Sequence, residues 1–282
     1  MRLASFSRAG HPGWGIVVAD GVVDLSRRLG ARYPTLRAAI AAGALSRMQS
    51  LAAEAADVPM AEIALALPIP DPAKIVCIGR NYKGHLAEGN LKLPEHPSVF
   101  LRALETFVPP GGALVRPRVS EQFDYEGELA LVIGMPGRHI APAPAAALRH
   151  VFGYTCLNDG SLRDYQFTHS LTVGKNFFRS GSIGPWIVTA DAIPDPTQLF
   201  LRTRLNGTEV QHTKTDDLIF DIPTIIAYVS AFMPLAAGDI IATGTPEGVG
   251  FARKPPLWMK AGDEIAVEIS GIGVLRNSVV DE

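Results

Sequence analysis

Two glutamates with one residue between them stand in the segment FDYEGELALVIG, residues 123–134. Side chains two apart in a strand point to the same face, so Glu126 and Glu128 are expected to project together, with Asp124 a candidate neighbour. Charged carboxylates at this spacing repel one another unless a cation lies between them. Oxygen ligands select Mg²⁺, Mn²⁺ or Ca²⁺ over zinc. The segment therefore predicts part of a divalent-metal site, although an exposed strand with ordinary acidic residues has the same pattern.

A third acidic candidate follows an apolar, strand-like run in GYTCLNDGSLRDYQ, residues 153–166. Asp159, at the end of that run, is suited to complete a metal site, but an aspartate or serine there also caps a helical turn. Arg163 and Gln166 have donors that can hold a carboxylate or a carbonyl of a ligand. Lys175, after the glycine of VGKNFF, offers a point charge to an anion, although a surface lysine is the more common reason for such a residue.

A histidine and a glutamate lie three residues apart in IGRNYKGHLAEGN, residues 78–90. On a helical turn His85 and Glu88 share a face and can form a hydrogen bond. A histidine oriented by a carboxylate is a recurrent general base, although a surface pair without a catalytic role is commoner. The glycine-rich loop of IATGTPEGVG follows a strand and brings Thr245 and backbone amides toward a ligand, or simply makes a tight turn.

The elements expected to position these residues begin with a small N-terminal unit. In GIVVADGVVDL (15–25) two apolar runs flank Asp-Gly, which predicts a hairpin. Residues 35–56 are rich in alanine and leucine with helical periodicity, which predicts one or two helices. Three prolines in LPIPDPA (67–73) predict a boundary. We therefore expect a small N-terminal domain over 1–68 and a catalytic, metal-binding domain over 69–282.

Beyond that boundary the pattern is mostly that of strands. Alternating or β-branched runs between turn residues predict strands over 74–79, 128–134, 184–190, 200–207, 238–244 and 263–269. Helices are predicted over 141–152 and over 222–232, the second with Pro223 in its first turn. Strands outnumber helices and do not alternate with them, which disfavours a doubly wound sheet or a TIM barrel. We predict a β-rich α+β fold.

The composition of the 282 residues excludes several classes of function. Apolar residues make up 47% and charged residues 19%, as in a globular protein. A formal charge of −2 and a pI of about 6.4 provide no basic surface for nucleic acid. No apolar run reaches the roughly 18–20 residues that cross a bilayer, and the first residues are not typical of a secretory signal. Cys77 and Cys156 are interpreted as reduced core residues. We expect a cytoplasmic protein without nucleic-acid or membrane partners.

Taken together, in this order and spacing, the motifs resemble the fumarylacetoacetate hydrolase family from about Lys74 to the C-terminus. The segments that carry the resemblance are KIVCIGRNYKGH, FDYEGELALVIG, NDGSLRDYQ, GKNF with GPWIVT, ATGTPEGVG and WMKAGDEIAVEISGIGVLRN. It implies a mixed β-roll or sandwich of the family's C-terminal type, often with a small N-terminal domain, that forms homodimers. Members hold Mg²⁺ or Mn²⁺, with Ca²⁺ a further option, through residues that correspond here to Glu126, Glu128 and Asp159.

The resemblance also implies roles for the other candidates. The His-x-x-Glu pair lies on a segment that can close over the substrate, so His85 and Glu88 are expected to be catalytic. Lys175 is expected to act beside them. Three further residues correspond to substrate contacts, namely Arg163, Gln166 and Thr245.

Two departures from the family pattern concern the metal shell and the substrate pocket. The founding C–C hydrolase has a further aspartate ligand where this chain has GRN (79–81), so water is expected to complete a shell of three carboxylates. Many members have FLKP where this chain has FLRA at 100–103. Arg102 is expected to take the place of that lysine near the substrate.

The leading hypothesis for the reaction is hydrolysis of a C–C bond in an acylpyruvate-like or related diketo acid. His85, oriented by Glu88, would deprotonate water, and the metal with Lys175 would stabilise the enolate that leaves. Decarboxylation of a β-keto acid such as oxaloacetate, or isomerisation of an unsaturated keto diacid, needs the same enolate and stays open. A metal-binding protein without catalysis is the alternative from another class, but a pure binder needs no general base.

Overall fold

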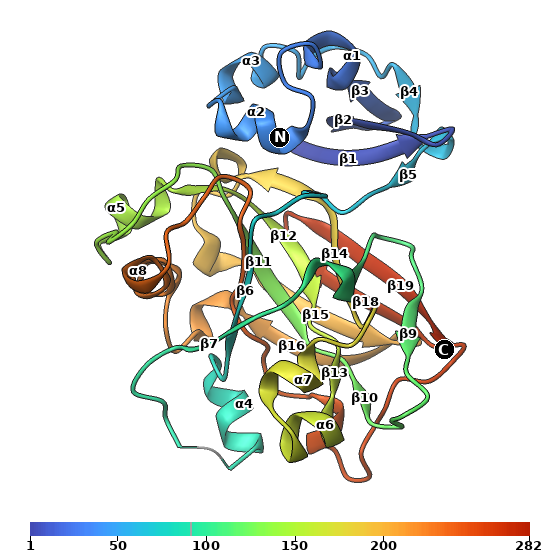
Figure 1. Cartoon of the computed structure of the whole chain (residues 1–282), viewed down its shortest axis with the longest axis vertical. Coiled ribbons are helices and arrows are strands. Elements are labelled where there is room, and N and C mark those ends of the chain that lie inside the picture. The colour runs from blue at the N-terminus through green and yellow to red at the C-terminus, as the bar shows by residue number, and fades with distance from the viewer. Residues whose placement is uncertain (91) are drawn as a thin grey trace.

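The computed structural model describes residues 1–90 and 92–282 and is built around a large mixed sheet (Figure 1). Its strands are β1 (Arg2–Arg8), β2 (His11–Val18), β3 (Gly21–Asp24), β4 (Val58–Pro59), β5 (Ala64–Leu65), β6 (Ile75–Gly79), β7 (Ser98–Leu101), β8 (Phe107–Val108), β11 (Gly127–Ile133), β12 (Val151–Asn158), β14 (Gly181–Thr189) and β17 (Ile240–Ala242). The main path runs β4-β3-β2-β1-β14-β12-β11-β17-β6-β7, while β5 pairs with β1 and β8 with β14.

A second sheet packs against the centre of the first. It has the order β16-β15-β18-β19-β9, with bounds β9 (Leu114–Arg116), β15 (Phe200–Leu205), β16 (Thr208–Lys214), β18 (Glu264–Ile269) and β19 (Gly273–Asp281). Leu129 and Cys156 from the large sheet share one buried cluster with Leu201 and Val267 from this one. A short pair, β10 (Phe123–Asp124) with β13 (Ser161–Leu162), completes the strands. The predicted β-rich α+β sandwich is confirmed.

The helices are short and lie at the periphery. They are α1 (Leu25–Leu29), α2 (Leu36–Ala41), α3 (Leu45–Gln49), α4 (Lys83–Glu88), α5 (Pro144–Leu148), α6 (Arg163–Thr168), α7 (Leu171–Lys175) and α8 (Ile222–Phe232). The bounds of α8 agree with the predicted helix, because Asp221 caps it by accepting the N–H of Thr224 at 2.8 Å. Among the described residues, no helix has both the length and the apolar character that a membrane crossing requires.

The N-terminal unit forms its own layer, drawn in blue in Figure 1. The predicted hairpin is present as β2 and β3, which pair from Gly15↔Asp24 to Val18↔Gly21. The helical stretch divides into α2 and α3, as one of the two expected outcomes. The unit is joined to the rest of the large sheet where β1 pairs with β14 through Leu3↔Ile187. The boundary at residues 67–73 falls in a segment without strands or helices, and the division into domains stays a prediction.

The predicted helix over 141–152 is wrong in its second half. Only Pro144–Leu148 are helical, as α5, and β12 begins at Val151. The run VFGYTCLN is aromatic and β-branched, and it pairs with the neighbouring strand through Ile133↔Val151. Sheet pairing therefore overrides the helical preference of the preceding alanines.

The pairing of β11 with β12 positions the acidic motifs. The two strands are antiparallel, and their register places Gly127 opposite Asn158. The residues around Gly127 and the residue after Asn158 therefore meet at the same end of the sheet. Both cysteines lie in the buried core as free thiols, as predicted.

Candidate metal centre and active site

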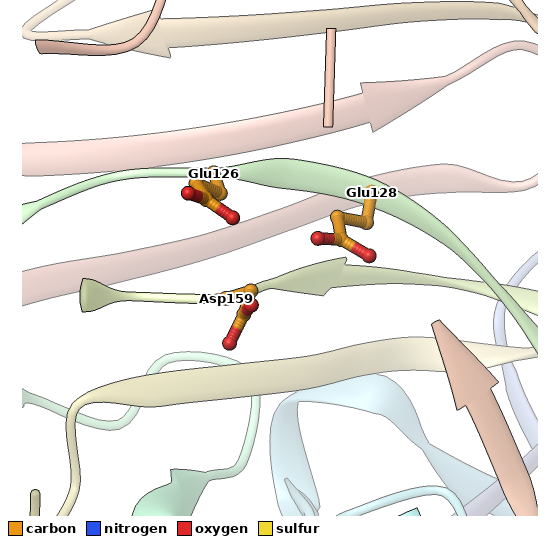
Figure 2. A group of neighbouring side chains, drawn as sticks. All are labelled: Glu126, Glu128 and Asp159. Atoms are coloured by element: carbon orange, nitrogen blue, oxygen red, sulfur yellow. The ribbon is translucent and has the colours of Figure 1, made fainter. Parts of the chain in front are cut away.

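Three acidic side chains converge at that end of the central strand pair (Figure 2). Glu126 lies just before β11, Glu128 is within β11, and Asp159 follows the last residue of β12. One oxygen from each side chain lies within 4.8 Å of the others, and all three residues are buried. The structure therefore brings together the set of residues that the sequence predicts as metal ligands.

Two arginines hold the outer oxygens of two of these carboxylates. Arg163 Nη2 lies 2.6 Å from Glu126 Oε1, and Arg102 Nη1 lies 2.5 Å from Asp159 Oδ1. The inner oxygens, Glu126 Oε2 and Asp159 Oδ2, each lie 2.7 Å from Lys175 Nζ. Burial raises the pKa of Glu126, but the charges of Lys175 and Arg163 outweigh it and lower this pKa to about 2. Each of the two carboxylates therefore has one oxygen beside an arginine and the other beside Lys175.

Glu128 differs because it forms no salt bridge with any residue that the structure describes. Its Oε2 accepts the backbone N–H of Gly244 at 2.8 Å. Gly244 has a φ of +105°, a conformation that favours glycine. Burial, followed by the charges of Asp159 and Glu126, raises the pKa of Glu128 well above its usual value. The protein itself provides too little positive charge for this carboxylate to ionise easily.

A hard divalent cation fits this donor set. Carboxylate oxygens are the ligands that Mg²⁺, Mn²⁺ and Ca²⁺ prefer. A cation between the three carboxylates would provide the positive charge that Glu128 lacks. An ion with about six ligands would keep positions for water and for substrate oxygens beside the three protein ligands.

The predicted catalytic dyad is formed on α4. His85 Nδ1 lies 2.8 Å from Glu88 Oε1. A carboxylate only accepts hydrogen bonds, so Nδ1 carries the hydrogen and the lone pair of Nε2 is left free. The second carboxylate oxygen, Glu88 Oε2, accepts the N–H of Gly248 at 2.8 Å, which ties α4 to the glycine-rich loop. His85 therefore has the tautomer and the support of a general base.

A cavity of about 400 Å³ joins the dyad to the acidic triad. Among the predicted residues, those that line it are His85, Glu126, Glu128, Arg163, Gln166, Lys175 and Thr245. Asp159 and Arg102 are not among the lining residues. The imidazole of His85, two of the three acidic residues and two cationic side chains, those of Arg163 and Lys175, thus surround one space of the size of a small ligand.

Arg163 is committed to other protein groups. Its Nε donates to Asp124 at 2.8 Å and its Nη1 to Gln166 Oε1 at 2.9 Å, while Nη2 faces Glu126. These bonds position the metal ligand Glu126. Because the carbonyl of Gln166 is occupied, its amide nitrogen is the group left to contact a substrate. The predicted substrate contacts of Arg163 and Gln166 both stay predictions. Gln166 has an amide N–H group available for such a contact, whereas the donors of Arg163 face protein groups.

Arg102 is buried, pairs with Asp159 and does not line the cavity. In addition to its pair with Asp159, its guanidinium donates to Ser180 Oγ at 2.7 Å and to Thr106 Oγ1 at 3.2 Å. Its contact with substrate stays a prediction, and its position supports a role in holding Asp159. Thr245 lines the cavity, and its hydroxyl donates to the carbonyl of Gly127 at 3.0 Å.

Asp124 is not part of the acidic triad, contrary to its candidacy from the spacing. The strand is interrupted between Asp124, the last residue of β10, and Gly127, the first of β11, so alternation does not extend across it. Asp124 instead accepts hydrogen bonds from Arg163 Nε and from the backbone N–H groups of Gly250, at 2.7 Å, and Phe251, at 3.0 Å. No feature of the sequence alone indicated this partnership.

Replacing Asp124 with alanine is expected to destabilise the fold by about 3–5 kcal/mol, because it removes one of the two buried carboxylates that pair with Arg163 and leaves two backbone N–H groups without their acceptor. Urea unfolding followed by circular dichroism measures the change. Asp216→Ala removes the exposed pair with Lys214 and is the control, expected to leave the free energy of unfolding close to that of wild type. Equal stability of the two variants would contradict the prediction.

A second residue that the site prediction left out is Arg80. It lines the cavity with a φ of +58°, a conformation rare outside glycine and found at functional sites. Arg80 belongs to the GRN segment (79–81), which attracts attention in the sequence only because it lacks the aspartate ligand of the founding hydrolase.

Comparison with known proteins agrees with this geometry. The model of the fumarylacetoacetate (FAA) hydrolase C-terminal domain matches residues 74–280. Rat "Oxaloacetate tautomerase Fahd2a, mitochondrial" is 37% identical over 289 residues, which cover 99% of this chain and 92% of that protein. "Oxaloacetate tautomerase YisK" of Bacillus subtilis is 43% identical over 226 residues, or 78% of this chain and 74% of that protein.

Solved structures give the same result. Maleylpyruvate hydrolase from Sphingobium sp. SYK-6, in complex with manganese(II) and pyruvate, superposes with a TM-score of 0.82 at 32% identity, covering 100% of this chain and 99% of that one. A 5-carboxymethyl-2-hydroxymuconate delta-isomerase from Mycobacterium smegmatis gives 0.79 at 30% identity and covers 100% of both chains. By the family model, by the sequence relatives and by its fold, the chain belongs to the fumarylacetoacetate hydrolase family.

Proposed function

We propose that this chain is a divalent-metal-dependent enzyme that interconverts the keto and enol forms of a small 2-keto diacid of the oxaloacetate type. The observation that carries the proposal is the single cavity that His85 lines together with Glu126 and Glu128, two of the three acidic residues. Relatives that match nearly the whole chain and are named oxaloacetate tautomerases support the choice of reaction.

The proposed ion is Mg²⁺ or Mn²⁺, with Ca²⁺ also compatible with the oxygen donors, and Glu126, Glu128 and Asp159 would hold it. A relative in complex with manganese(II) and pyruvate supports this choice. Once bound, the ion would draw electron density from the carboxylate and keto oxygens of the substrate and so acidify the neighbouring C–H group.

The residues of the chain provide the proton transfers. His85 Nε2 takes a proton from C3 of the keto form, and the resulting imidazolium returns it to the oxygen on C2, so that no proton is gained or lost overall. Glu88 stabilises the imidazolium because its carboxylate accepts the Nδ1 hydrogen at 2.8 Å. The amide nitrogen of Gln166 and the ammonium of Lys175 would bind the 1-carboxylate and the C2 oxygen, a role supported by the presence of both residues in the cavity lining.

Arg80 is assigned to the second carboxylate of the diacid. Replacing it with alanine is expected to raise KM for oxaloacetate by about 10- to 100-fold, since a hydrogen bond to a charged group contributes about 1.5–3 kcal/mol. Hydrogen exchange at the methyl group of pyruvate, which has no second carboxylate, is the matched comparison and should keep its KM. The same loss for both substrates would contradict the assignment.

Hydrolysis of a C–C bond in an acylpyruvate is the second candidate. The likeness to a maleylpyruvate hydrolase supports it, and His85 Nε2 is equally able to take a proton from water. The two functions differ in what becomes of the substrate. Hydrolysis produces two fragments, whereas tautomerisation leaves the mass unchanged.

The test combines both reactions in deuterated buffer. The EDTA-treated protein, with and without added Mn²⁺, is given enol-oxaloacetate and a panel of acylpyruvates, and products are followed by NMR. Tautomerisation predicts Mn²⁺-dependent loss of the enol with deuterium entering C3. Two fragments from an acylpyruvate establish hydrolysis, release of CO₂ establishes decarboxylation, and inertness toward the whole panel with Mn²⁺ bound favours a non-catalytic binder.

A further inference from the structure

The segment from Gly248 to Phe251 is held rigidly beneath α4. Gly248 has a φ of +95°, and a Cβ there would lie 2.1 Å from the carbonyl oxygen of Val210. Its carbonyl accepts the hydroxyl of Tyr125 at 3.1 Å. The backbone N–H of Phe251 donates to the buried carboxylate of Asp124 at 3.0 Å. The backbone from which the Phe251 side chain projects is therefore held in place by the protein core.

The ring of Phe251 contacts both the proposed general base and an arginine that holds one of the acidic residues. It meets the imidazole of His85 edge-on, with centroids 6.4 Å apart and an interplanar angle of 87°. The guanidinium carbon of Arg163, which pairs with Glu126, lies 4.6 Å from the ring centroid. The same ring also packs against Phe167, with centroids 5.4 Å apart. One aromatic side chain therefore contacts both halves of the proposed catalytic machinery.

Helix α4 contacts this loop through both members of the proposed catalytic dyad. The helix has only six residues, Lys83–Glu88, and no side-chain cap at its N-terminus. It meets the loop at two points, namely the bond from the N–H of Gly248 to Glu88 and the contact of His85 with Phe251. The first point fixes the C-terminal end of the helix, and the second limits how far the imidazole can move toward Arg163.

We propose that Phe251 is a positioning residue that sets the spacing between the base His85 and the acidic triad. The inference rests on the proposed role of His85 as the base. A smaller side chain would leave the imidazole free to occupy several positions, whereas Arg163 would still be held by its bonds to Asp124, Gln166 and Glu126. The base would lose its alignment while the metal site stayed intact.

Phe251→Ala is therefore expected to lower kcat by about 10- to 100-fold, because a misplacement on the order of 1 Å costs a catalytic group about that factor. The affinity for Mn²⁺, measured by titration calorimetry, should remain within about threefold of wild type. Phe251→Leu keeps most of the volume and should lose less activity, and it replaces the alanine variant in the test if the latter does not fold.

Phe200→Ala is the matched control, because the ring of Phe200 also contacts a histidine, with its centroid 6.3 Å from that of His212. Phe200 is 47% exposed and is not among the residues that line the cavity. Its removal should leave both kcat and KM within about threefold of wild type. A kcat for Phe251→Ala within twofold of wild type, or an equal loss in Phe200→Ala, would overturn the proposal.

A measurement without turnover separates this inference from the proposed function. The imidazole C–H signals of His85, assigned by their loss in His85→Asn, should be sharp in wild type and broadened or multiple in Phe251→Ala. Signals that stay equally sharp in both proteins would overturn the positioning role. If the wild-type protein were inactive toward every keto acid, the proposed function would fail, while the NMR comparison would still decide whether Phe251 positions the imidazole.

Discussion

Replacing Glu128 with glutamine is expected to abolish metal binding and to lower kcat/KM by more than about 10³-fold, while the chain still folds. Glu128 forms no salt bridge within the described part of the chain, and its one hydrogen bond, from the N–H of Gly244, can be kept by the amide oxygen of glutamine. The substitution therefore removes one of the three inner oxygens and disturbs little else. Calorimetric titration with Mn²⁺ and the tautomerase assay measure the two effects.

The same variant tests the electrostatics of the metal-free protein. Burial and the neighbouring carboxylates raise the pKa of Glu128 above its usual value of 4.5. A carboxyl with a raised pKa in the folded state costs no stability below the unfolded value, and it costs increasingly more as the pH rises from there toward the folded value. In EDTA, wild type should therefore lose Tm relative to Glu128→Gln as the pH rises above the usual pKa of a glutamate. Added Mn²⁺ should raise the Tm of wild type alone.

Glu264→Gln is the control for this pair of measurements. Glu264 is an exposed residue of β18, in the second sheet, and pairs with Arg276 at 2.9 Å. It is also far from the triad in the sequence. Its replacement should leave both the affinity for Mn²⁺ and the pH dependence of Tm as in wild type. Binding of Mn²⁺ by Glu128→Gln with wild-type affinity would show that the triad is not the metal site.

The sequence predicted best what depends on local pattern. The bounds of α8 and the hairpin of β2 and β3 agree with the structure because capping, proline position and turn residues act over a few residues. The helix predicted over 141–152 failed where long-range pairing decides, since the pairing of Val151 with Ile133 on β11 determines that β12 begins there. Local preference is informative only until a neighbouring strand competes for the same backbone.

The candidate site shows the same division. Glu126, Glu128 and Asp159 were recognisable because acidic residues at strand ends are chemically conspicuous and the family motifs have them. The groups that hold these carboxylates were not, because an arginine reaches its partner only in the folded chain. Arg102 pairs with Asp159, and its predicted contact with the substrate stays a prediction, while Asp124 joins Arg163 and not the triad. Spacing identifies ligands more readily than it identifies the residues that position them.

Replacing His85 with alanine is expected to lower kcat by roughly 10²–10⁴-fold, the usual contribution of a positioned general base. His85 holds none of the three carboxylates in a salt bridge, so the affinity for Mn²⁺ should stay close to that of wild type. The rate at which deuterium enters C3 of the substrate measures the base directly. A kcat within tenfold of wild type would show that another group transfers the proton.

Glu88→Gln should be intermediate. Glutamine can still accept one hydrogen bond through its single oxygen, but it has no charge to stabilise the imidazolium of His85, and it cannot serve both Nδ1 and the N–H of Gly248 as the carboxylate does. We expect a loss in kcat of about 10- to 100-fold, smaller than that of His85→Ala. Full activity in Glu88→Gln would mean that the carboxylate only caps the loop.

The chain contains its own matched control for the dyad. His212 and Glu209 are also three residues apart, with His212 Nδ1 3.5 Å from Glu209 Oε1, but both side chains are exposed, at 45% and 44%. His212→Ala should leave kcat and KM unchanged. The two pairs have the same sequence separation, but His85 has the shorter contact with its glutamate, 2.8 Å against 3.5 Å, is buried, and lines the cavity with Glu126 and Glu128. A different outcome for the two alanine variants would therefore show that environment, and not the His–Glu pair itself, produces the catalytic base.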